Sequence, residues 1–143
     1  MQIYDKAKYH VEGEYPADLP PQQASVHTGM FLGWLVDHSL LGGDFANDFA
    51  GDISEFRRRK ITGPQLYTRS GGVLDESMLN PEGNHFASVY FDFDNGKFID
   101  DYEEVLVQEL PSFYHVQDSW NNYSKLCERL DERYSEWKRD GVI

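Results

Sequence analysis

The chain has 143 residues and a formal net charge of −12, and its composition is 40% hydrophobic and 15% aromatic. A chain of this length forms one domain with a buried core, and its aromatic content excludes a disordered protein. The negative charge argues against a general nucleic-acid binder or a protein that binds anionic membranes. No stretch reaches the roughly 18 apolar residues of a membrane span. We therefore expect a single domain over residues 1–143, with no nucleic-acid or membrane partner.

The cysteine content and the amino terminus predict where the protein works. Cys127 is the only cysteine, so it cannot form an internal disulfide, which is typical of a protein from a reducing compartment. Residues 1–10 contain neither an apolar run nor a small-residue cleavage site, so no secretory signal is expected. These features predict a cytoplasmic protein.

Hydrophobic residues recur at helical spacing along most of the chain. After a proline-rich segment at 15–21, residues 22–41 form an amphipathic helix pattern that Gly42 and Gly43 end. Asp44 can cap a second helix, whose apolar residues at 45, 49, 53 and 56 share one face. Two shorter elements follow: a third helix opened by Thr62 with Pro64, and a single turn capped by Asp75.

The clearest helix is the last one, which we expect from about residue 117 to 138. Its apolar residues alternate spacings of four and three, which indicates one long amphipathic face. These residues are Val116, Trp120, Tyr123, Cys127, Leu130, Tyr134 and Trp137. The sequence thus predicts a mainly α, compact domain of about five helices, in which this face packs against the helices near 24–41 and 44–58.

The segment 86–106 fits two patterns. Apolar residues at 86, 89, 90 and 93, and again at 98, 102 and 106, have helical spacing. Residues 89, 91 and 93 also alternate as in a strand, and Asp94-Asn95-Gly96 is a hairpin turn signal. Because the neighbouring segments are helical, we favour two short helices around a turn. A short β-hairpin near 88–102 is the alternative.

The same segment partly matches a calcium-binding loop. Asp92, Asp94 and Glu103 fall at loop positions one, three and twelve. Gly96, however, occupies position five, where an oxygen ligand is needed, and Lys97 replaces the glycine of position six. We interpret the stretch as an Asx-type turn. The sequence predicts no metal or cofactor site.

Motifs for catalysis are equally sparse, and we predict no catalytic residue. The five histidines lack the spacing and the glutamate of a zinc helix motif: His10, His27, His38, His85 and His115. His27 lies on the apolar stripe of its helix, which favours a hydrogen-bonded core histidine. Cys127 lies on the apolar face of the last helix, which favours a buried thiol over a nucleophile. No glycine-rich phosphate loop is present.

Acidic residues are concentrated in one part of the chain. Residues 71–112 hold ten acidic residues and one basic residue, Lys97, a net charge of −9. This polarisation predicts one charged face, and the alternative is a solvated surface that keeps the protein soluble. The candidate residues for binding a basic protein are Asp92, Asp94, Asp100, Asp101, Glu103, Glu104 and Glu109.

Six sequence blocks together resemble a family of small bacterial proteins of uncharacterised function. The blocks are YDKAKYH (4–10), HTGMFLGWL (27–35), ITGPQLY (61–67), NPEGNHFASVYFDF (80–93), DYEEVL (101–106) and LPSFYHVQDSWNNY (110–123). The resemblance spans nearly the whole chain and implies no established catalytic residues. Similar small acidic bacterial proteins are often immunity partners of contact-dependent or secreted toxins, so by analogy the resemblance suggests such a role.

Two functional hypotheses follow. The first is an acidic protein-binding module that neutralises a basic partner such as a toxin, in the manner of an immunity or antitoxin protein. Its apolar anchors would be aromatic side chains such as Trp34, Tyr90 or Tyr102. The second is a small enzyme or ligand-binding protein that uses a cleft combining His10, His27 or His115 with carboxylates. Sequence spacing does not show whether these residues meet.

Overall fold

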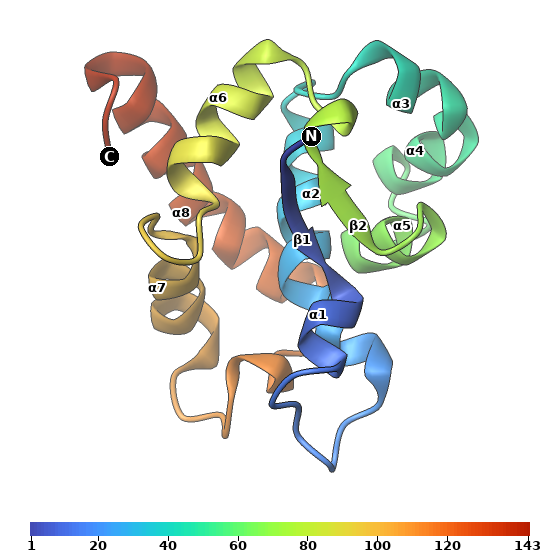
Figure 1. Ribbon diagram of the computed structural model, residues 1–143, viewed down its shortest axis with the longest axis vertical. Coiled ribbons are helices and arrows are strands. Elements are labelled where there is room, and N and C mark those ends of the chain that lie inside the picture. The colour runs from blue at the N-terminus through green and yellow to red at the C-terminus, as the bar shows by residue number, and fades with distance from the viewer.

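One helix, α2 (Val26–Asp37), runs through the middle of the molecule and the other elements pack around it (Figure 1). The computed structural model describes residues 1–143. All eleven residues from Val26 to Val36 are buried. A helix that is apolar on all sides requires neighbours on all sides. Figure 1 shows α6, α7 and α8 on one side of α2, and α3 to α5 on the other.

The structure is mainly helical, as predicted, with eight α-helices where we expected about five. Besides α2 they are α1 (Ala7–Val11), α3 (Gly43–Asp48), α4 (Ala50–Arg57), α5 (Gly63–Arg69), α6 (Pro81–Tyr90), α7 (Phe98–Tyr102) and α8 (Trp120–Asp140). Short 3-10 turns are η1 (Pro21–Ser25), η2 (Glu76–Met78) and η4 (Phe113–His115), and η3 (Glu103–Val107) is a π-helical turn that continues α7. None of the helices is both long and apolar enough to cross a membrane.

The only sheet has two antiparallel strands that lie far apart in the sequence. Strand β1 (Ile3–Lys6) pairs with β2 (Val73–Asp75), so that Asp5 lies opposite Leu74 and Lys6 opposite Val73. Residues 81–90 and 98–102 are helices α6 and α7, which confirms the favoured interpretation of two short helices. The alternative hairpin near 88–102 does not form.

Two of the predicted helices have different boundaries in the structure. The helix expected from Asp44 to Phe56 is two helices, because Phe49 leaves helical geometry at φ −116° and ψ 27°. The helix expected over 22–41 starts with the 3-10 turn η1 and ends at Asp37, and Ser39 follows with φ 57°. Local hydrophobic spacing does not record such breaks, since the apolar faces continue across them.

Helix α8 confirms the prediction for the carboxyl-terminal region. Ser119 caps it by accepting a hydrogen bond from the N–H of Asn122, and Gly141 ends it with φ 74°. Tyr123 and Leu130 of the predicted face are buried, together with Leu126, which the spacing pattern did not include. Val116 of that face is also buried, and the face's remaining residues pack partly buried against the core: Trp120, Cys127, Tyr134 and Trp137. The rings of Trp120 and Tyr123 lie about 6 Å from that of Phe56, which joins α8 to α4.

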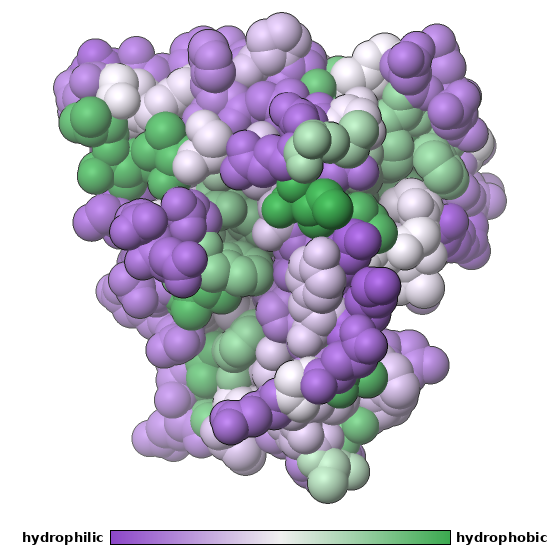
Figure 2. All heavy atoms as spheres, viewed as in Figure 1, coloured by the Kyte–Doolittle hydropathy of each residue, from purple (hydrophilic) through white to green (hydrophobic).

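Polar residues cover most of the molecular surface. Figure 2 shows one face, where hydrophilic residues predominate and hydrophobic residues appear in separate groups between them. The large hydrophobic side chains that remain exposed are Met1, Ile3, Tyr9, Val11, Val89, Phe93, Leu110 and Val142. Three of these, Val89, Phe93 and Leu110, belong to the acidic part of the chain.

Glycines allow α2 and α5 to approach each other closely. A Cβ atom added to Gly29 would lie 2.3 Å from Cα of Pro64, and one added to Gly63 would lie 2.3 Å from the carbonyl oxygen of Gly29. Both clashes involve main-chain or proline ring atoms, which cannot move without shifting a helix. The crossing of α2 and α5 therefore depends on the missing side chains of these two glycines.

The variant Gly29→Ala should destabilise the fold by about 1–3 kcal/mol, the usual cost of overpacking a core. Gly51→Ala is the matched control, because a Cβ atom at Gly51 in α4 would meet no atom within 4 Å. This control should be neutral or stabilising by up to about 1 kcal/mol. Urea unfolding followed by circular dichroism measures both, and equal effects at the two positions would contradict the close crossing.

Candidate functional site

The structure places six of the seven predicted partner-binding carboxylates at the surface and buries the seventh. Asp92 is half-buried, and the other five surface residues are exposed: Asp94, Asp100, Glu103, Glu104 and Glu109. We call these six residues the acidic face. They run from the turn between α6 and α7 to the residues that follow η3. Only Glu104 has an ion-pair partner, so five of the six carboxylates have none.

The turn that begins the acidic face is an Asx-type turn, as predicted. Oδ1 of Asp92 accepts hydrogen bonds from the backbone N–H groups of Asp94 at 3.0 Å and Asn95 at 3.3 Å. Gly96 is required here, because a Cβ atom would lie 2.3 Å from the carbonyl oxygen of Tyr90. The carboxylate of Asp92 thus stabilises the turn through hydrogen bonds, whereas Asp94 is exposed to solvent.

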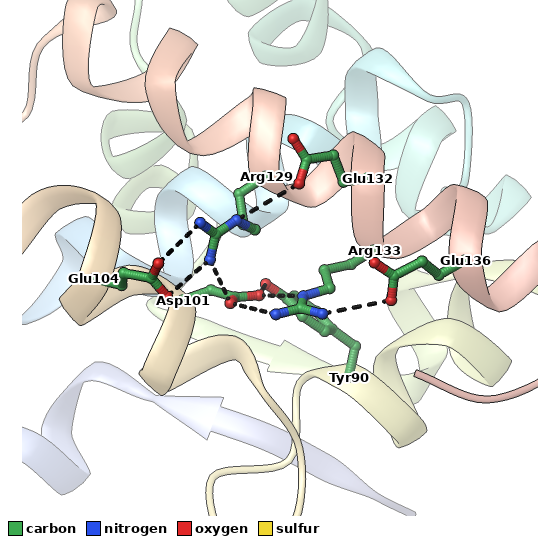
Figure 3. Close-up of polar contacts among 7 residues, drawn as sticks. All are labelled: Tyr90, Asp101, Glu104, Arg129, Glu132, Arg133 and Glu136. Atoms are coloured by element: carbon green, nitrogen blue, oxygen red, sulfur yellow. Dashed lines mark hydrogen bonds and ion pairs between the residues drawn. The ribbon is translucent and has the colours of Figure 1, made fainter.

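Asp101 is not part of this surface, which corrects its prediction as a partner-binding residue. Only 1% of the residue is exposed, and its carboxylate faces α8 (Figure 3). Arg133 donates to both of its oxygens at 2.8 and 2.9 Å, and Arg129 donates at 2.8 Å. Tyr90 of α6 completes the set with a hydrogen bond of 2.7 Å from its hydroxyl. The acidic sequence around Asp101 does not indicate which of its carboxylates is buried.

The arginines extend this buried group into a network that joins α6, α7 and η3 to α8. Arg129 also pairs with Glu104 and Glu132, and Arg133 also pairs with Glu136 (Figure 3). Burial alone would raise the pKa of Asp101, but the hydrogen bonds from Arg133, Tyr90 and Arg129 lower it below its usual value. The charged form of Asp101 therefore fixes α7, and with it the acidic face, onto α8.

Replacing Asp101 with Asn should destabilise the protein by about 3 kcal/mol at pH 7, because two partly buried arginines lose a charged partner. Both arginines keep another carboxylate, so the loss should not reach the upper end of the range for broken buried pairs. Since the pKa of Asp101 is lowered by folding, its stabilisation is present above the unfolded-state pKa of about 3.9 and is lost as pH falls through the folded pKa.

Urea unfolding at a series of pH values tests this dependence. The difference between wild type and Asp101→Asn should be constant from neutral pH down to about pH 5 and then narrow as the pH falls further. Asp100→Asn is the matched control, since Asp100 is exposed, lies beside Asp101 and forms no ion pair. An equal loss of stability in both variants would contradict the role assigned to Asp101.

A second polar cluster lies inside the molecule, where three elements meet. Asp5 comes from β1, His10 from α1 and His27 from the first turn of α2. Nε2 of His10 lies 2.8 Å from Oδ1 of Asp5, and Nε2 of His27 lies 3.3 Å from Oδ2 of Asp5. The two Nε2 atoms are 3.2 Å apart. These three side chains thus direct their polar atoms to one point.

Further side chains hold this cluster in place. The hydroxyl of Thr28 donates to Oδ2 of Asp5 at 2.6 Å, and the hydroxyl of Tyr114 lies 2.7 Å from Nδ1 of His10. The rings of Phe93 and Phe113 pack on the imidazoles, with centroids 6.0 Å from His10 and 5.0 Å from His27, respectively. The result is a polar group within an aromatic shell, which excludes water from most of it.

Burial and hydrogen bonding act in opposite directions on the charges of this cluster. Burial alone would raise the pKa of Asp5, yet the hydrogen bonds and charges of His10 and His27 lower it well below its usual value. Burial lowers the pKa of His27, despite the opposing effect of Asp5. At neutral pH Asp5 is therefore a carboxylate and His27 a neutral imidazole.

The structure also decides which of the histidines proposed for a cleft come together. His10 and His27 meet, whereas His115 binds Ser112 and Asp18 at distances of 2.8 and 3.0 Å and lies outside the cluster. His27 is 1% exposed and hydrogen-bonded, so its prediction as a core histidine is confirmed. Sequence reasoning missed Asp5, because an acid at the buried position of a four-residue strand follows no hydrophobic pattern.

Cys127 carries no sign of a nucleophilic site. The residue is partly buried on α8, and burial raises the pKa of its thiol to about 12. A thiol with such a pKa is protonated at neutral pH, and the protonated form is not nucleophilic. This agrees with its prediction as a packed, unreactive side chain.

Comparison with known proteins gave one match. The model of a family described as a domain of unknown function (DUF7832) matches residues 3–116. This range contains the acidic face and the cluster of Asp5, His10 and His27, and it ends before α8 with Arg129 and Arg133. Neither the curated proteins nor the solved structures contain a match to the chain.

Proposed function

We propose that this chain, which belongs to the DUF7832 family, is an acidic protein-binding module that neutralises a basic protein partner. An immunity or antitoxin protein that occupies a toxin would act in this way, and the proposal places it in the cytoplasm. The observation that carries the proposal is the set of five exposed or half-exposed carboxylates without ion-pair partners between Asp92 and Glu109. Uncompensated like charges repel one another and cost stability in the folded state, so they favour a surface that meets positive charge elsewhere.

The acidic face is also suited to binding because it is held rigidly. Asp101 fixes α7 on α8, and Asp92 with Gly96 fixes the preceding turn. Side chains on a rigid element lose less conformational freedom when a partner docks. The charge would act mainly on the rate of association, because long-range attraction steers a basic partner toward the face.

Apolar anchors for such an interface differ from those expected from the sequence. Trp34, Tyr90 and Tyr102 are all buried in the core, so none of them can contact a partner. Phe93 and Leu110 are instead exposed, and they lie near the two ends of the segment 92–109 in the sequence. A docked protein could therefore bury these two apolar side chains beside the carboxylates, because protein interfaces combine apolar and polar contacts.

Reversing three unpaired carboxylates tests the proposal. Asp100→Lys, Glu103→Lys and Glu109→Lys in one variant should leave the fold intact, because all three side chains are exposed. The matched control is Glu12→Lys, Glu14→Lys and Asp48→Lys, which makes the same change in net charge at exposed, unpaired positions outside the acidic face. Both variants and the wild type serve as baits in parallel capture from the source cells.

The partner of interest is a basic protein that wild type and control retain and the acidic-face variant loses. Surface plasmon resonance with this protein over a salt series should show association slowed by on the order of 10-fold or more at low salt, with a flatter salt dependence. Equal association rates for the acidic-face variant and the control would refute a role for this surface. So would a capture experiment in which no protein distinguishes the two variants.

The cluster of Asp5, His10 and His27 favours a second candidate function. A small enzyme or ligand-binding protein would use these groups, since His10 and His27 share one carboxylate as that hypothesis requires. His10 connects the cluster to solvent, because 13% of its side chain is exposed. The acidic-face variants leave these three residues unchanged, so the two candidates can be tested separately.

A further inference from the structure

We propose that Asp5, His10 and His27 bind one divalent transition-metal ion of the zinc type. The ligands are a carboxylate oxygen of Asp5 and the Nε2 atoms of the two histidines. This site goes beyond the proposed function, because it involves none of the residues of the acidic face. It rests on three observations: the separations of the ligand atoms, the hydrogen bonds behind them, and the chemistry of the donor set.

The separations of the three atoms fit one metal ion. With Oδ2 as the ligand oxygen of Asp5, they are 2.9 Å between Oδ2 and Nε2 of His10, 3.2 Å between the two Nε2 atoms, and 3.3 Å between Oδ2 and Nε2 of His27. Zinc binds nitrogen and oxygen at about 2.0–2.2 Å in a tetrahedron, which places its ligands about 3.3 Å from one another. The three atoms therefore already occupy three corners of such a tetrahedron to within a few tenths of an ångström.

The orientation of the imidazoles supports the same assignment. Their rings are perpendicular, with centroids 4.6 Å apart, and each directs Nε2 at the other and at the same carboxylate. At 3.2 Å the two Nε2 atoms can share one hydrogen bond, and when its proton is released both nitrogen lone pairs can bind a cation. An ion at the common centre satisfies both nitrogens and the carboxylate at once.

Hydrogen bonds behind the ligands are those of a built metal site. The hydroxyl of Tyr114 can accept the Nδ1–H of His10, which leaves the Nε2 lone pair free for the ion. The hydroxyl of Thr28 donates to Oδ2 of Asp5, which orients the carboxylate and leaves the second lone pair of this oxygen free to bind the ion. Metal-binding histidines and carboxylates are typically held by such outer partners.

The donor set selects the class of ion. Two imidazoles and one carboxylate suit zinc and neighbouring divalent transition metals, including iron in its two-histidine, one-carboxylate sites. Calcium and magnesium prefer an all-oxygen set, which the two histidines do not supply. Because only three protein ligands converge, a fourth position remains for water or a substrate. The partly exposed side chain of His10 gives the ion a route from solvent.

Metal binding would also tie the amino-terminal elements to the core. The ligands come from β1, α1 and α2, so one ion would link the first ten residues to the central helix. An ion that binds only the folded state raises its stability. This gives a measurement that depends on neither an activity nor a partner.

The experiment uses the full chain, stripped of metal with a chelator and titrated with zinc chloride by calorimetry. Wild type should bind one zinc ion per chain and melt at a higher temperature when zinc is present. His10→Gln should lose more affinity than the roughly 10–100-fold cost of removing an outer hydrogen-bond partner, and Tyr114→Phe should show a loss of that smaller size. His38→Gln is the matched control, since His38 pairs with Asp131 at 2.9 Å without a second imidazole, and it should bind zinc as wild type does.

Cobalt(II) absorption and NMR detect metal binding at this site directly in the wild-type protein. Bound cobalt(II) should give visible d–d absorption, and zinc should shift the Nε2 resonances of His10 and His27 while those of the other histidines stay unchanged. These measurements decide the question even if His10→Gln does not keep the native circular dichroism spectrum. Unchanged resonances of His10 and His27, or equal zinc binding by wild type and a folded His10→Gln variant, would overturn the proposal.

Discussion

The complete burial of α2 is the constraint on which the rest of the structure depends. Because every side of this helix is covered, its neighbours must approach it at close range, and glycines make this possible. The absence of a side chain at Gly29 allows Pro64, near the start of α5, to contact α2. A Cβ atom at Gly33 would lie 2.8 Å from the ring of Phe56 in α4. The helix also carries His27 and Thr28 into the interior, where polar groups need partners. Asp5 is the partner of both side chains: it accepts a hydrogen bond from Thr28 and lies 3.3 Å from Nε2 of His27.

Two buried carboxylates organise a protein whose other acidic residues lie mostly at the surface. Asp5 joins β1 and α1 to α2 through two histidines and a threonine, and Asp101 joins α7 to α8 through two arginines and a tyrosine. In both places the charge is compensated by donors from other elements, which lowers the pKa of each carboxyl group. The remaining acidic residues of 92–109 have few such donors, which is why they form a face.

Phe93 connects the two proposed sites. It lies in the turn that begins the acidic face, is partly exposed, and packs its ring about 6 Å from those of His10 and His27. The aromatic shell of the histidine cluster and the turn that begins the acidic face therefore share one side chain.

Local sequence patterns correctly predicted the mainly helical class, the last helix, the caps at Thr62 and Asp75, and the Asx-type turn at Asp92. These features depend on residues within one or two turns of each other, so local spacing records them. Tertiary packing instead determines that Asp101 is buried while its neighbour Asp100 is exposed, and that β1 pairs with β2. It alone brought Asp5, His10, His27 and Tyr114 together, from residues up to 109 positions apart. Such contacts arise when helices pack around α2, and no pattern of neighbouring residues contains that information.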